Sequence, residues 1–552
     1  MPYHKVTKVR EIHDEASDTW VNEFVAPGAA GYAYALIPRD IQDVKTVRAH
    51  LLRKGAVRAL LTDEAIAEAI ADEVDAVRRA ARTGWRNGGA VFVSHGHVAG
   101  DTGDVRVLPP ENKLVAHLEP AGDDARWKKL AKVARYSTAM TVVLCATFAA
   151  PLLRLLNRQS FAVVLYGPSR IGKTTAQLLG ASAMGFANEE DLPTFKATEA
   201  GLLAAAMGFN DLLLPINEVG TAPGKKKDKY DAIYDATYAL TSGHDVIRHP
   251  IWNGGNASDG AGFRLIAMIS SEHAPDAWAA RKGENRDAGE TARMFGLSAL
   301  YDGIPSIFDQ PPEDVDGADF PEWEKKQFAK LKKRLPEQCG VAFSDFMEKV
   351  VEDHDAVRDL AADLVAAFEG AVATAGMSPV QRDIVANFGV LYAGGMIAID
   401  KGVLPFVANE LIEDVKRACR ATLDGLSDPT AELRADLATL KGHLGSGAVV
   451  DWDKRTAKQA TLMQQADGWH VAKGTGREFV IRGTAFMGLF TSEVRARHVL
   501  EHLDDEGYLA HGRERTTRRS NEWAQRQVTW PNGSRPRSFT IFLPGGLDDL
   551  DL

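Results

Sequence analysis

The spacing of apolar residues in the first 130 positions predicts two small regions of mixed structure. The expected elements of the first are a strand at Gly31–Pro38 (GYAYALIP), a helix at Asp40–Lys54, a strand at Ala56–Leu61 and an Ala-rich helix from Asp63 to about Arg82. The expected elements of the second are short strands at Ala90–Ser94, Val105–Leu108 and Lys113–His117, separated by turns. We therefore predict an α/β accessory region at residues 1–84 and a β-rich module at residues 85–130.

Continuous apolar runs alternate with helical segments from Phe161 to about Gln310, which is the pattern of a parallel sheet covered by helices. We expect an α/β core at residues 131–310 and, from the Ala-rich segments that follow, a helical region at residues 311–445. The pattern becomes mixed again in residues 446–544. The last eight residues, 545–552 (GGLDDLDL), are expected to be a disordered acidic tail.

The apolar segment Thr138–Leu156 is, at 19 residues, just long enough to cross a bilayer. Pro151 interrupts it, and basic residues flank it, with RWKK before it and Arg154 and Arg158 near its end. A strand-like run also begins soon afterwards, at Phe161. These features favour a buried helix over a membrane span, and we predict a protein without a membrane partner.

Composition excludes several classes of protein. Of the 552 residues, 45% are apolar and 25% are charged, which argues against a disordered or collagen-like chain. The formal net charge of −10 excludes a uniformly basic nucleic-acid coat but permits a local basic patch. Cys145, Cys339 and Cys419 are far apart and form no CxxC motif, which argues against disulfides or a zinc site. Because the charged N-terminus also has no secretory apolar region, we expect a cytoplasmic protein.

A glycine-rich motif directly follows the apolar run Phe161–Tyr166 (FAVVLY), which has the composition of a buried parallel strand. The motif has the P-loop pattern GxxxxGK[ST], and its residues are Gly167, Pro168, Ser169, Arg170, Ile171, Gly172, Lys173 and Thr174, with Thr175 next. Lys173 would reach the β- and γ-phosphates of ATP, and Thr174 would ligate Mg²⁺. Helix-forming residues follow and would place a helix N-terminus at the phosphates. An ordinary glycine turn is the alternative, but the order of strand, loop and helix favours nucleotide binding.

A second apolar strand ends in polar residues at Asp211–Gly220 (DLLLPINEVG). This is the Walker B pattern, in which one acid holds Mg²⁺ through water and a following Glu polarises the attacking water. Here the pair is Asn217 and Glu218, so Glu218 is the candidate base, and Asn217 is an uncharged candidate for the metal. Pro215 is unusual because proline cannot donate to a central ladder. A plain buried strand is the alternative.

A third strand, Phe263–Glu272 (FRLIAMISSE), ends in Ser270 and Ser271. In additional-strand ATPases a polar residue at this place contacts the γ-phosphate or the attacking water, and Ser270 aligns better. Arg286 and Arg293 follow, and Arg293 directly precedes the next apolar run. It is our candidate for an arginine that acts on a neighbouring subunit's site. The alternatives are a strand end without a role and a surface salt bridge.

Two stretches are candidates for DNA contact. Thr241–Arg248 lies between the second and third strands, where hexameric motors carry DNA-contacting hairpins, and its candidates are His244, Arg248 and the adjacent His249. Near the C-terminus a helix opened by Thr491–Glu493 and a short strand precede residues 511–540, which hold seven Arg and two Glu. Helix, strand and basic turn together predict a winged helix, with Arg513, Arg515, Arg518 and Arg519 toward phosphates. A solvated hairpin or a protein-binding wing is the alternative.

These motifs resemble the DUF927 family, P-loop ATPases of bacterial mobile elements, phages and archaea thought to be hexameric AAA+-type helicases. The matching blocks are LYGPSRIGKTTAQLLGASAMG, TFKATEAGLLAAAMGFNDLLLPINEVG, the tract Tyr238–Arg248, the strand ending in Ser270-Ser271-Glu272, GVAFSDFMEKV, RDIVANFGVLYAGGMIAIDKGVLPF and GYAYALIPRDIQ. The resemblance covers most of the chain and is strongest from about 85 to 406. The family's functional residues match at Gly167, Gly172, Lys173, Thr174 and Glu218, and less closely at Ser270 and Arg293. Asn217 departs from the family's usual Asp.

The resemblance implies ATP and Mg²⁺ as cofactors and a homo-oligomeric ring, a hexamer. It also implies movement on single-stranded or forked DNA during replication of an element or phage. The expected fold is an AAA+-like P-loop core with a parallel sheet, flanked by the N-terminal α/β region, the helical region and the winged helix. Two other functions stay open. One is an ATPase switch that remodels protein in regulation or defence, and the other is a DNA-binding protein with a weakened nucleotide site.

Overall fold

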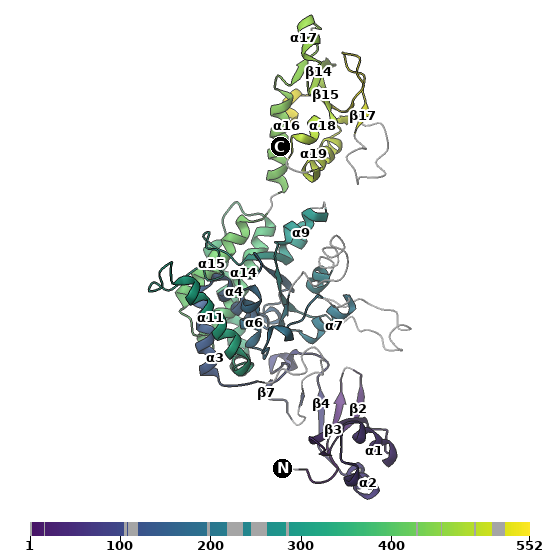
Figure 1. Cartoon of the computed structure of the whole chain (residues 1–552), viewed down its shortest axis with the longest axis vertical. Coiled ribbons are helices and arrows are strands. Elements are labelled where there is room, and N and C mark those ends of the chain that lie inside the picture. Colours follow the sequence, from purple (N-terminus) through teal and green to yellow (C-terminus); the bar gives the residue numbers. More distant parts are fainter. Residues whose placement is uncertain are drawn as a thin grey trace. The chain divides into compact units, whose positions relative to one another are not determined.

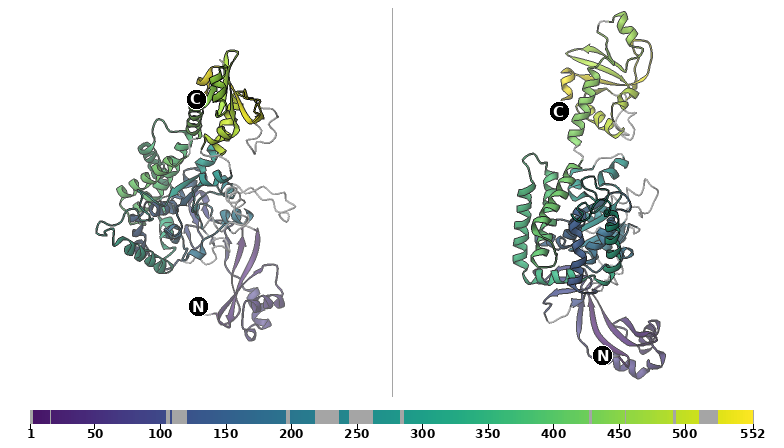
Figure 2. Two further views of the ribbon diagram at one scale, coloured as in Figure 1. Left: turned by 45° about the horizontal axis from the view of Figure 1, so that its top comes forward. Right: turned by 60° about the vertical axis from the view of Figure 1, so that its left-hand side comes forward.

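The computed structural model describes residues 3–15, 17–103, 107–108, 120–195, 199–217, 236–243, 262–282, 286–426, 429–453, 455–490, 493–510 and 525–551. Contacts divide the chain into two compact units, one made of residues 1–278 and 286–425 and the other of residues 279–285 and 426–552. Figure 1 labels the elements, and Figure 2 shows them from two further directions. Each unit has hydrophobic clusters of its own.

The N-terminal region of the first unit is a five-stranded sheet with two helices packed against one face. Its elements are β1 (Thr7–Asp14), β2 (Thr19–Gly28), β3 (Gly31–Pro38), α1 (Val44–Arg53), α2 (Asp63–Ala71), β4 (Ala76–Arg79) and β8 (Val107–Leu108). The strands lie in the order β3-β2-β1-β4-β8. Phe24, Ile37, Val47 and Leu51 are buried in the core between sheet and helices.

Two expectations for this region are wrong. Ala56–Leu61 is not a strand, because Arg58–Leu60 forms a 3₁₀ turn there. The helix from Asp63 ends at Ala71, and the chain continues as β4, where Val77 is buried. The strand β1 was also not expected, because charged residues outnumber apolar ones in it. The sheet accommodates them in pairs, such as Arg10 of β1 with Glu23 of β2.

The β-rich module is a three-stranded antiparallel sheet of β5 (Gly84–Arg86), β6 (Val91–Val93) and β7 (Val98–Gly100). It is attached to the base of the core by Asp211, whose side chain is fully buried. The Trp85 amide donates to Asp211 Oδ2 at 3.1 Å, and Arg154 Nε donates to the same oxygen at 2.8 Å. The described part of the expected strand Val105–Leu108 is β8, which pairs with β4 of the N-terminal sheet and not with this module. The expected strand Lys113–His117 lies outside the described residues.

The core contains a four-stranded parallel sheet of β9 (Phe161–Tyr166), β10 (Leu212–Ile216), β11 (Leu265–Ser271) and β12 (Met294–Ser298). The strand order is β10-β11-β9-β12. The three strands predicted from the motifs are present, the apolar run after Arg293 forms β12, and the α/β class with a parallel sheet is confirmed. Nearly every residue in them is buried, which explains the continuous apolar runs. Pro215 lies in β10, at an edge of the described sheet, where its missing N–H is tolerated.

Helices cover this sheet, and α4, α6, α14 and α15 pack against its strands or against one another (Figures 1 and 2). The described helices of the first unit after residue 120 are α3 (Asp124–Ala131), α4 (Thr138–Ala149), α5 (Leu152–Leu155), α6 (Lys173–Ser182), α7 (Glu199–Gly208), α10 (Ala288–Arg293), α11 (Phe320–Arg334), α12 (Val341–Glu352), α13 (His354–Val372), α14 (Pro379–Asp400) and α15 (Ala408–Asp424). A further helix, α9 (Pro275–Lys282), begins in the first unit and ends among the residues assigned to the second.

The apolar segment from Thr138 forms α4, in which every residue is buried, followed by the short α5 after Pro151. The prediction of a buried helix is therefore confirmed. Among the described residues, one helix, α14, is long and apolar enough to cross a bilayer, with a mean hydropathy of 1.3 over its most apolar window. Of that window, 72% is buried within the protein, as in the core helix of a folded domain.

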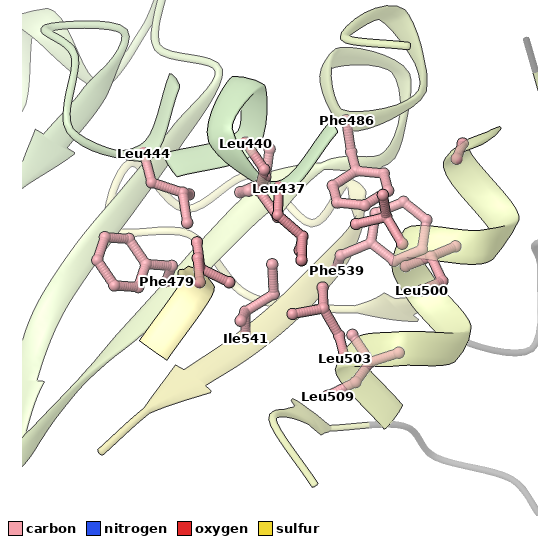
Figure 3. Close-up of a cluster of buried hydrophobic side chains, with 14 of the residues drawn as sticks. Leu437, Leu440, Leu444, Phe479, Phe486, Leu500, Leu503, Leu509, Phe539 and Ile541 are labelled. Atoms are coloured by element: carbon pink, nitrogen blue, oxygen red, sulfur yellow. The ribbon is translucent and has the colours of Figure 1, made fainter. Parts of the chain in front are cut away.

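The second unit combines a mixed sheet with four helices among its described residues. Its elements are α16 (Pro429–Leu444), β13 (Val449–Asp451), α17 (Ala457–Leu462), β14 (Gly468–Lys473), β15 (Gly476–Arg482), α18 (Gly483–Gly488), α19 (Glu493–Asp505), β16 (Leu509–Ala510), β17 (Arg526–Gln527) and β18 (Arg537–Leu543). The strand order is β13-β14-β15-β18-β16, with β17 beside β18. Figure 3 shows the apolar cluster in which Leu437 and Leu440 of α16 meet Phe486, Leu500 and Ile541.

The structure places two C-terminal features differently from the sequence-based expectation. The helix α16, expected in the helical region, shares the core of the second unit. The acidic tail is ordered as a 3₁₀ turn at Gly546–Leu550, and Leu550 is 2% exposed. Lys441 Nζ binds Asp548 at 3.0 Å and Asp551 at 2.7 Å. The expectation of disorder overlooked this buried leucine and the lysine that neutralises the acidic side chains.

Candidate functional site

The glycine-rich segment forms the loop between the end of β9 and the start of α6. Gly172 has a φ of 104°, and a Cβ atom added there would lie 2.6 Å from Cζ of Phe328, so glycine is required. Pro168, Ser169 and Arg170 are exposed at the top of the loop, and Ile171 is partly buried. The loop therefore presents its backbone to solvent at the N-terminus of α6, where the helix dipole favours an anion.

Lys173 begins α6, and its side chain returns into the loop. Its Nζ donates to the carbonyl oxygens of Gly167 at 2.7 Å and Pro168 at 2.6 Å. Burial lowers the pKa of Lys173 below its ordinary value, and the carboxylate of Glu272 acts in the opposite direction. A positive charge is thus held in the centre of the loop.

Thr174, Asn217 and Ser270 meet beside this lysine although they come from α6 and from the ends of two strands. Thr174 Oγ1 donates to Asn217 Oδ1 at 3.2 Å, and Ser270 Oγ donates to the same oxygen at 3.0 Å. The Asn217 backbone is held by its own amide, which donates to the Pro193 carbonyl at 2.7 Å. Three oxygen-bearing side chains predicted from separate motifs therefore form one cluster, and none of the three is charged.

Gln177 is a residue that the sequence analysis did not identify. Its side chain is fully buried in α6, and Nε2 donates to the carbonyls of Ile216 at 3.0 Å and Met268 at 2.7 Å. It therefore joins the helix to β10 and β11 directly below the cluster. A polar residue at a buried position, one turn after the glycine-rich motif, is the signal that would have found it. Near the surface, Thr175 Oγ1 lies 3.5 Å from Glu189 Oε1.

The candidate base Glu218 lies outside the described residues. Another acid, Glu272, follows β11 directly and was noted in the sequence only as the end of a strand. Ser271 Oγ accepts from the His273 amide at 3.0 Å and donates to the His273 carbonyl at 2.7 Å, which forms a tight turn around Glu272. Because the Gly167 amide donates to the Ser271 carbonyl at 3.3 Å, this turn lies beside the glycine-rich loop.

The two arginines after β11 have different surroundings. Arg286 is buried, and it binds Asp276 at 3.0 Å and Glu290 at 3.2 Å, so its role is structural. Arg293 is partly exposed at the end of α10, directly before β12. Met294 pairs with Ala162 near the beginning of β9, so Arg293 lies at the edge of the sheet opposite to the glycine-rich loop.

A pocket of about 660 Å³ lies between the carboxyl ends of β9 and β12 and the helix α15. Arg417 crosses its wall, with Nη1 donating to Asp309 at 3.0 Å and Nη2 donating to Asp302 at 2.5 Å. Burial raises the pKa of Asp414 to about 6, although Gln310 Nε2 donates to this carboxylate at 2.6 Å. None of these residues was singled out from the sequence, because they come from segments without a recognisable motif.

The candidates for DNA contact lie outside the described residues. They are His244, Arg248, His249, Arg513, Arg515, Arg518 and Arg519. The described elements around the C-terminal ones are α19, which begins at Glu493, and the strands β16 and β18. Arg495 of α19 is bound to Asp436 of α16 at 2.7 Å, so this arginine supports the helix pair.

Comparisons with known proteins agree with part of the sequence analysis. A family model described as "Domain of unknown function (DUF927)" matches residues 34–248, which confirms the resemblance over the stretch from β3 through the glycine-rich loop and β10. No curated protein matches the chain. The match to the family model is thus limited to the N-terminal part of the chain.

The solved structure of "SCCmec type IV Cch - active helicase" is similar in fold, with a TM-score of 0.57 and 11% sequence identity. The match covers 98% of this chain and 93% of that chain. Because the similarity extends over nearly the full length of both chains, it includes the regions before and after the core sheet. It therefore supports a common architecture beyond the stretch that the family model matches.

Proposed function

We propose that this chain is an ATP-driven DNA helicase or translocase that works as a homo-oligomeric ring, a hexamer, in replicating a mobile element or phage. The observation that carries the proposal is the cluster of Lys173, Thr174, Asn217 and Ser270 at the carboxyl ends of parallel strands. Ligands of open α/β sheets bind at this edge. The fold similarity to a protein named as an active helicase supports DNA as the proposed substrate.

The glycine-rich loop would bind the phosphates of ATP. Its backbone N–H groups and the N-terminus of α6 supply dipoles, and Lys173 supplies a full positive charge. Gly167, Pro168, Ser169, Arg170, Ile171, Gly172 and Thr175 complete this cradle. The order β10-β11-β9 supports the assignment, because one additional strand separates the strand before the loop from the strand that ends at Asn217.

Thr174 and Asn217 would hold Mg²⁺, and their chemistry fits that ion, because hydroxyl and amide oxygens are hard donors. When bound, the ion would neutralise charge on the phosphates. The side chains of Asn217 and Ser270 are uncharged and cannot act as a base. The carboxylate of Glu218, next to Asn217 in the chain, would therefore orient the attacking water. Ser270, already hydrogen-bonded to Asn217, would contact the γ-phosphate side.

Arg293 would act on the site of a neighbouring subunit. It precedes β12, a strand of five residues, so about 16 Å of extended chain separates it from the carboxyl edge of its own sheet. An arginine at that distance cannot reach the loop of its own chain. A ring, in which each site faces the next subunit, gives it a phosphate to contact.

DNA contact would come from Arg248 and from the basic stretch with Arg513, Arg515, Arg518 and Arg519. The second unit supports this by its order of elements, since α18 and α19 follow each other in the chain and are followed by β16, the basic stretch and β18. This is the order of a winged helix, whose wing lies against phosphates. The acidic chain as a whole carries −10, so such contacts have to be local.

Strand displacement tests the proposal. Purified wild-type protein with ATP and Mg²⁺ should separate a forked DNA duplex, and Lys173→Ala should not. A protein that hydrolyses ATP without separating strands, whatever the fork, would instead be a switch that remodels protein. A protein that binds DNA but releases no phosphate from ATP would be the second candidate, a DNA-binding protein with a weakened nucleotide site, which the uncharged Asn217 favours.

A further inference from the structure

The strand order indicates which way a bound nucleotide lies. Thr174 and Ser270 both donate to Asn217. Asn217 follows β10 and Ser270 lies at the end of β11, and these two strands follow each other on one side of β9. On the other side of β9 lies β12, and neighbouring strands are about 4.8 Å apart. A nucleoside triphosphate is elongated, so if its terminal phosphate faces β10 and β11, its nucleoside end points toward β12.

The pocket of about 660 Å³ lies at this place. Tyr166 and Ser298, at the ends of β9 and β12, form one wall, and Arg417 and Ala421 of α15 form another. The pocket begins where the glycine-rich loop begins, because Ala299 Cβ would lie 3.3 Å from a Cβ atom added at Gly167. Its volume is within the usual range of about 300–1,000 Å³ for small-molecule sites.

The charge of the pocket favours the uncharged end of a nucleotide. Its lining carries four carboxylates and two guanidinium groups, at Asp302, Glu413, Asp414, Asp424, Arg417 and Arg420. This excess of negative charge repels phosphate groups, which the loop with Lys173 attracts. Carboxylates accept hydrogen bonds from ribose hydroxyls and from the amino groups of bases, so the two regions are complementary to the two ends of one molecule.

The walls of the pocket are held in place before any ligand arrives. Arg417 connects α15 to Asp302 and Asp309, and Asp309 Oδ1 also accepts from the Thr138 amide of α4 at 2.8 Å. Tyr301 is only 5% exposed, and its hydroxyl has no hydrogen-bond partner among the described residues. A wall in which Arg417 pairs with the fully buried Asp309, and in which a hydroxyl is still able to bond, suits recognition of a polar ligand.

From this arrangement we infer that the pocket between β12 and α15 binds the nucleoside, that is, the base and ribose, of the triphosphate held by the glycine-rich loop. The inference rests on the proposed function, because it requires a nucleotide in that loop. The inference adds to the proposed function a separate site, with residues from 298–310 and 413–424, that selects a nucleotide over a plain polyphosphate.

Filling the pocket tests the inference. Ala421→Phe places a ring in it, and Asn409→Phe places the same ring on the exposed first turn of α15 as a matched control. Binding of ATP and of inorganic tripolyphosphate, each with Mg²⁺, is measured by calorimetry for wild type and both variants. We expect Ala421→Phe to lower the affinity for ATP on the order of tenfold or more and to leave the affinity for tripolyphosphate unchanged, since only ATP has a nucleoside. Asn409→Phe should bind both ligands like wild type.

Each other outcome has a distinct meaning. If wild type binds neither ligand, the proposed function itself fails. If wild type binds both ligands and Ala421→Phe keeps full affinity for ATP, the nucleoside lies elsewhere and the inference is overturned. The same holds if Ala421→Phe lowers the affinities for ATP and tripolyphosphate equally while it unfolds at the wild-type temperature. If the phenylalanine lowers the unfolding temperature, Ala421→Leu, a smaller filler, is measured in its place and the same two comparisons apply.

Discussion

The glycine-rich loop and the pocket beside it both adjoin the end of the same strand, β9, but they are built in different ways. The loop uses consecutive residues, 167–175, and attracts negative charge with backbone groups and Lys173. The pocket uses residues from three separate segments and is rich in carboxylates held by Arg417. The difference teaches that the proposed phosphate site, which would bind the groups common to all nucleotides, is local in sequence. The proposed nucleoside site, which would distinguish one nucleotide from another, is assembled by the fold.

The largest effect is expected from Lys173→Ala. Removing this ammonium should slow ATP hydrolysis by at least roughly a hundredfold, because one preorganised positive group at developing charge contributes that much. Lys173→Ala should also lower the affinity for tripolyphosphate, whereas Ala421→Phe should leave that affinity unchanged. Phosphate release and calorimetry on the two variants separate the loop from the pocket. Wild-type turnover in Lys173→Ala would rule out the loop as the phosphate site.

Glu218→Gln should slow hydrolysis by about a hundredfold, within the range for loss of a group that orients or deprotonates water, while ATP and tripolyphosphate still bind. Glu272→Gln is the matched control, since this acid lies beside the loop and acts electrostatically on Lys173. We expect its rate to stay within about tenfold of wild type. Single-turnover rates with bound ATP measure both. The reverse order of effects would transfer the role of base to Glu272.

A smaller effect is expected from mixing two inactive variants. Arg293→Ala and Lys173→Ala should each be inactive as pure proteins, but a mixed ring contains some interfaces with an intact loop on one subunit and an intact arginine on the next. Hydrolysis by the mixture should therefore exceed that of either variant. Subunit exchange is checked with two labels. A mixture that exchanges subunits but stays inactive would show that Arg293 does not complete a neighbour's site.

The smallest effect concerns the pH dependence of the free energy of unfolding. Burial raises the pKa of Asp414 from 3.8 to about 6 in the folded protein, so between these values the folded state binds its proton more tightly than the unfolded chain. Stability from this group should therefore be present near pH 4 and decrease as pH rises toward 6, by on the order of 2 kcal/mol. Asp414→Asn should flatten that decrease in chemical denaturation at several pH values. Asp309, whose pKa is also raised by burial, stays in both proteins, so equal slopes would contradict the assignment to Asp414.

Sequence patterns predicted the fold best where burial dominates. The strands β9, β10, β11 and β12 are buried on both faces, so continuous apolar runs identify them without further information. Prediction failed where charged side chains are paired by residues from other segments of the chain. The strand β1 is mostly polar and depends on partners such as Glu23, and the acidic end of the chain is ordered by Lys441, about a hundred residues earlier.

The sequence by itself determined the loop, because its glycines, Lys173 and the helix-forming residues after them act through local backbone geometry. It also indicated Thr174, Asn217 and Ser270 one by one. Only the tertiary structure brought these three within hydrogen-bonding distance, because the order β10-β11-β9 decides which strand ends are neighbours. The pocket could not be predicted at all, because its carboxylates and Arg417 come from separate segments that meet only when α15 packs beside β12.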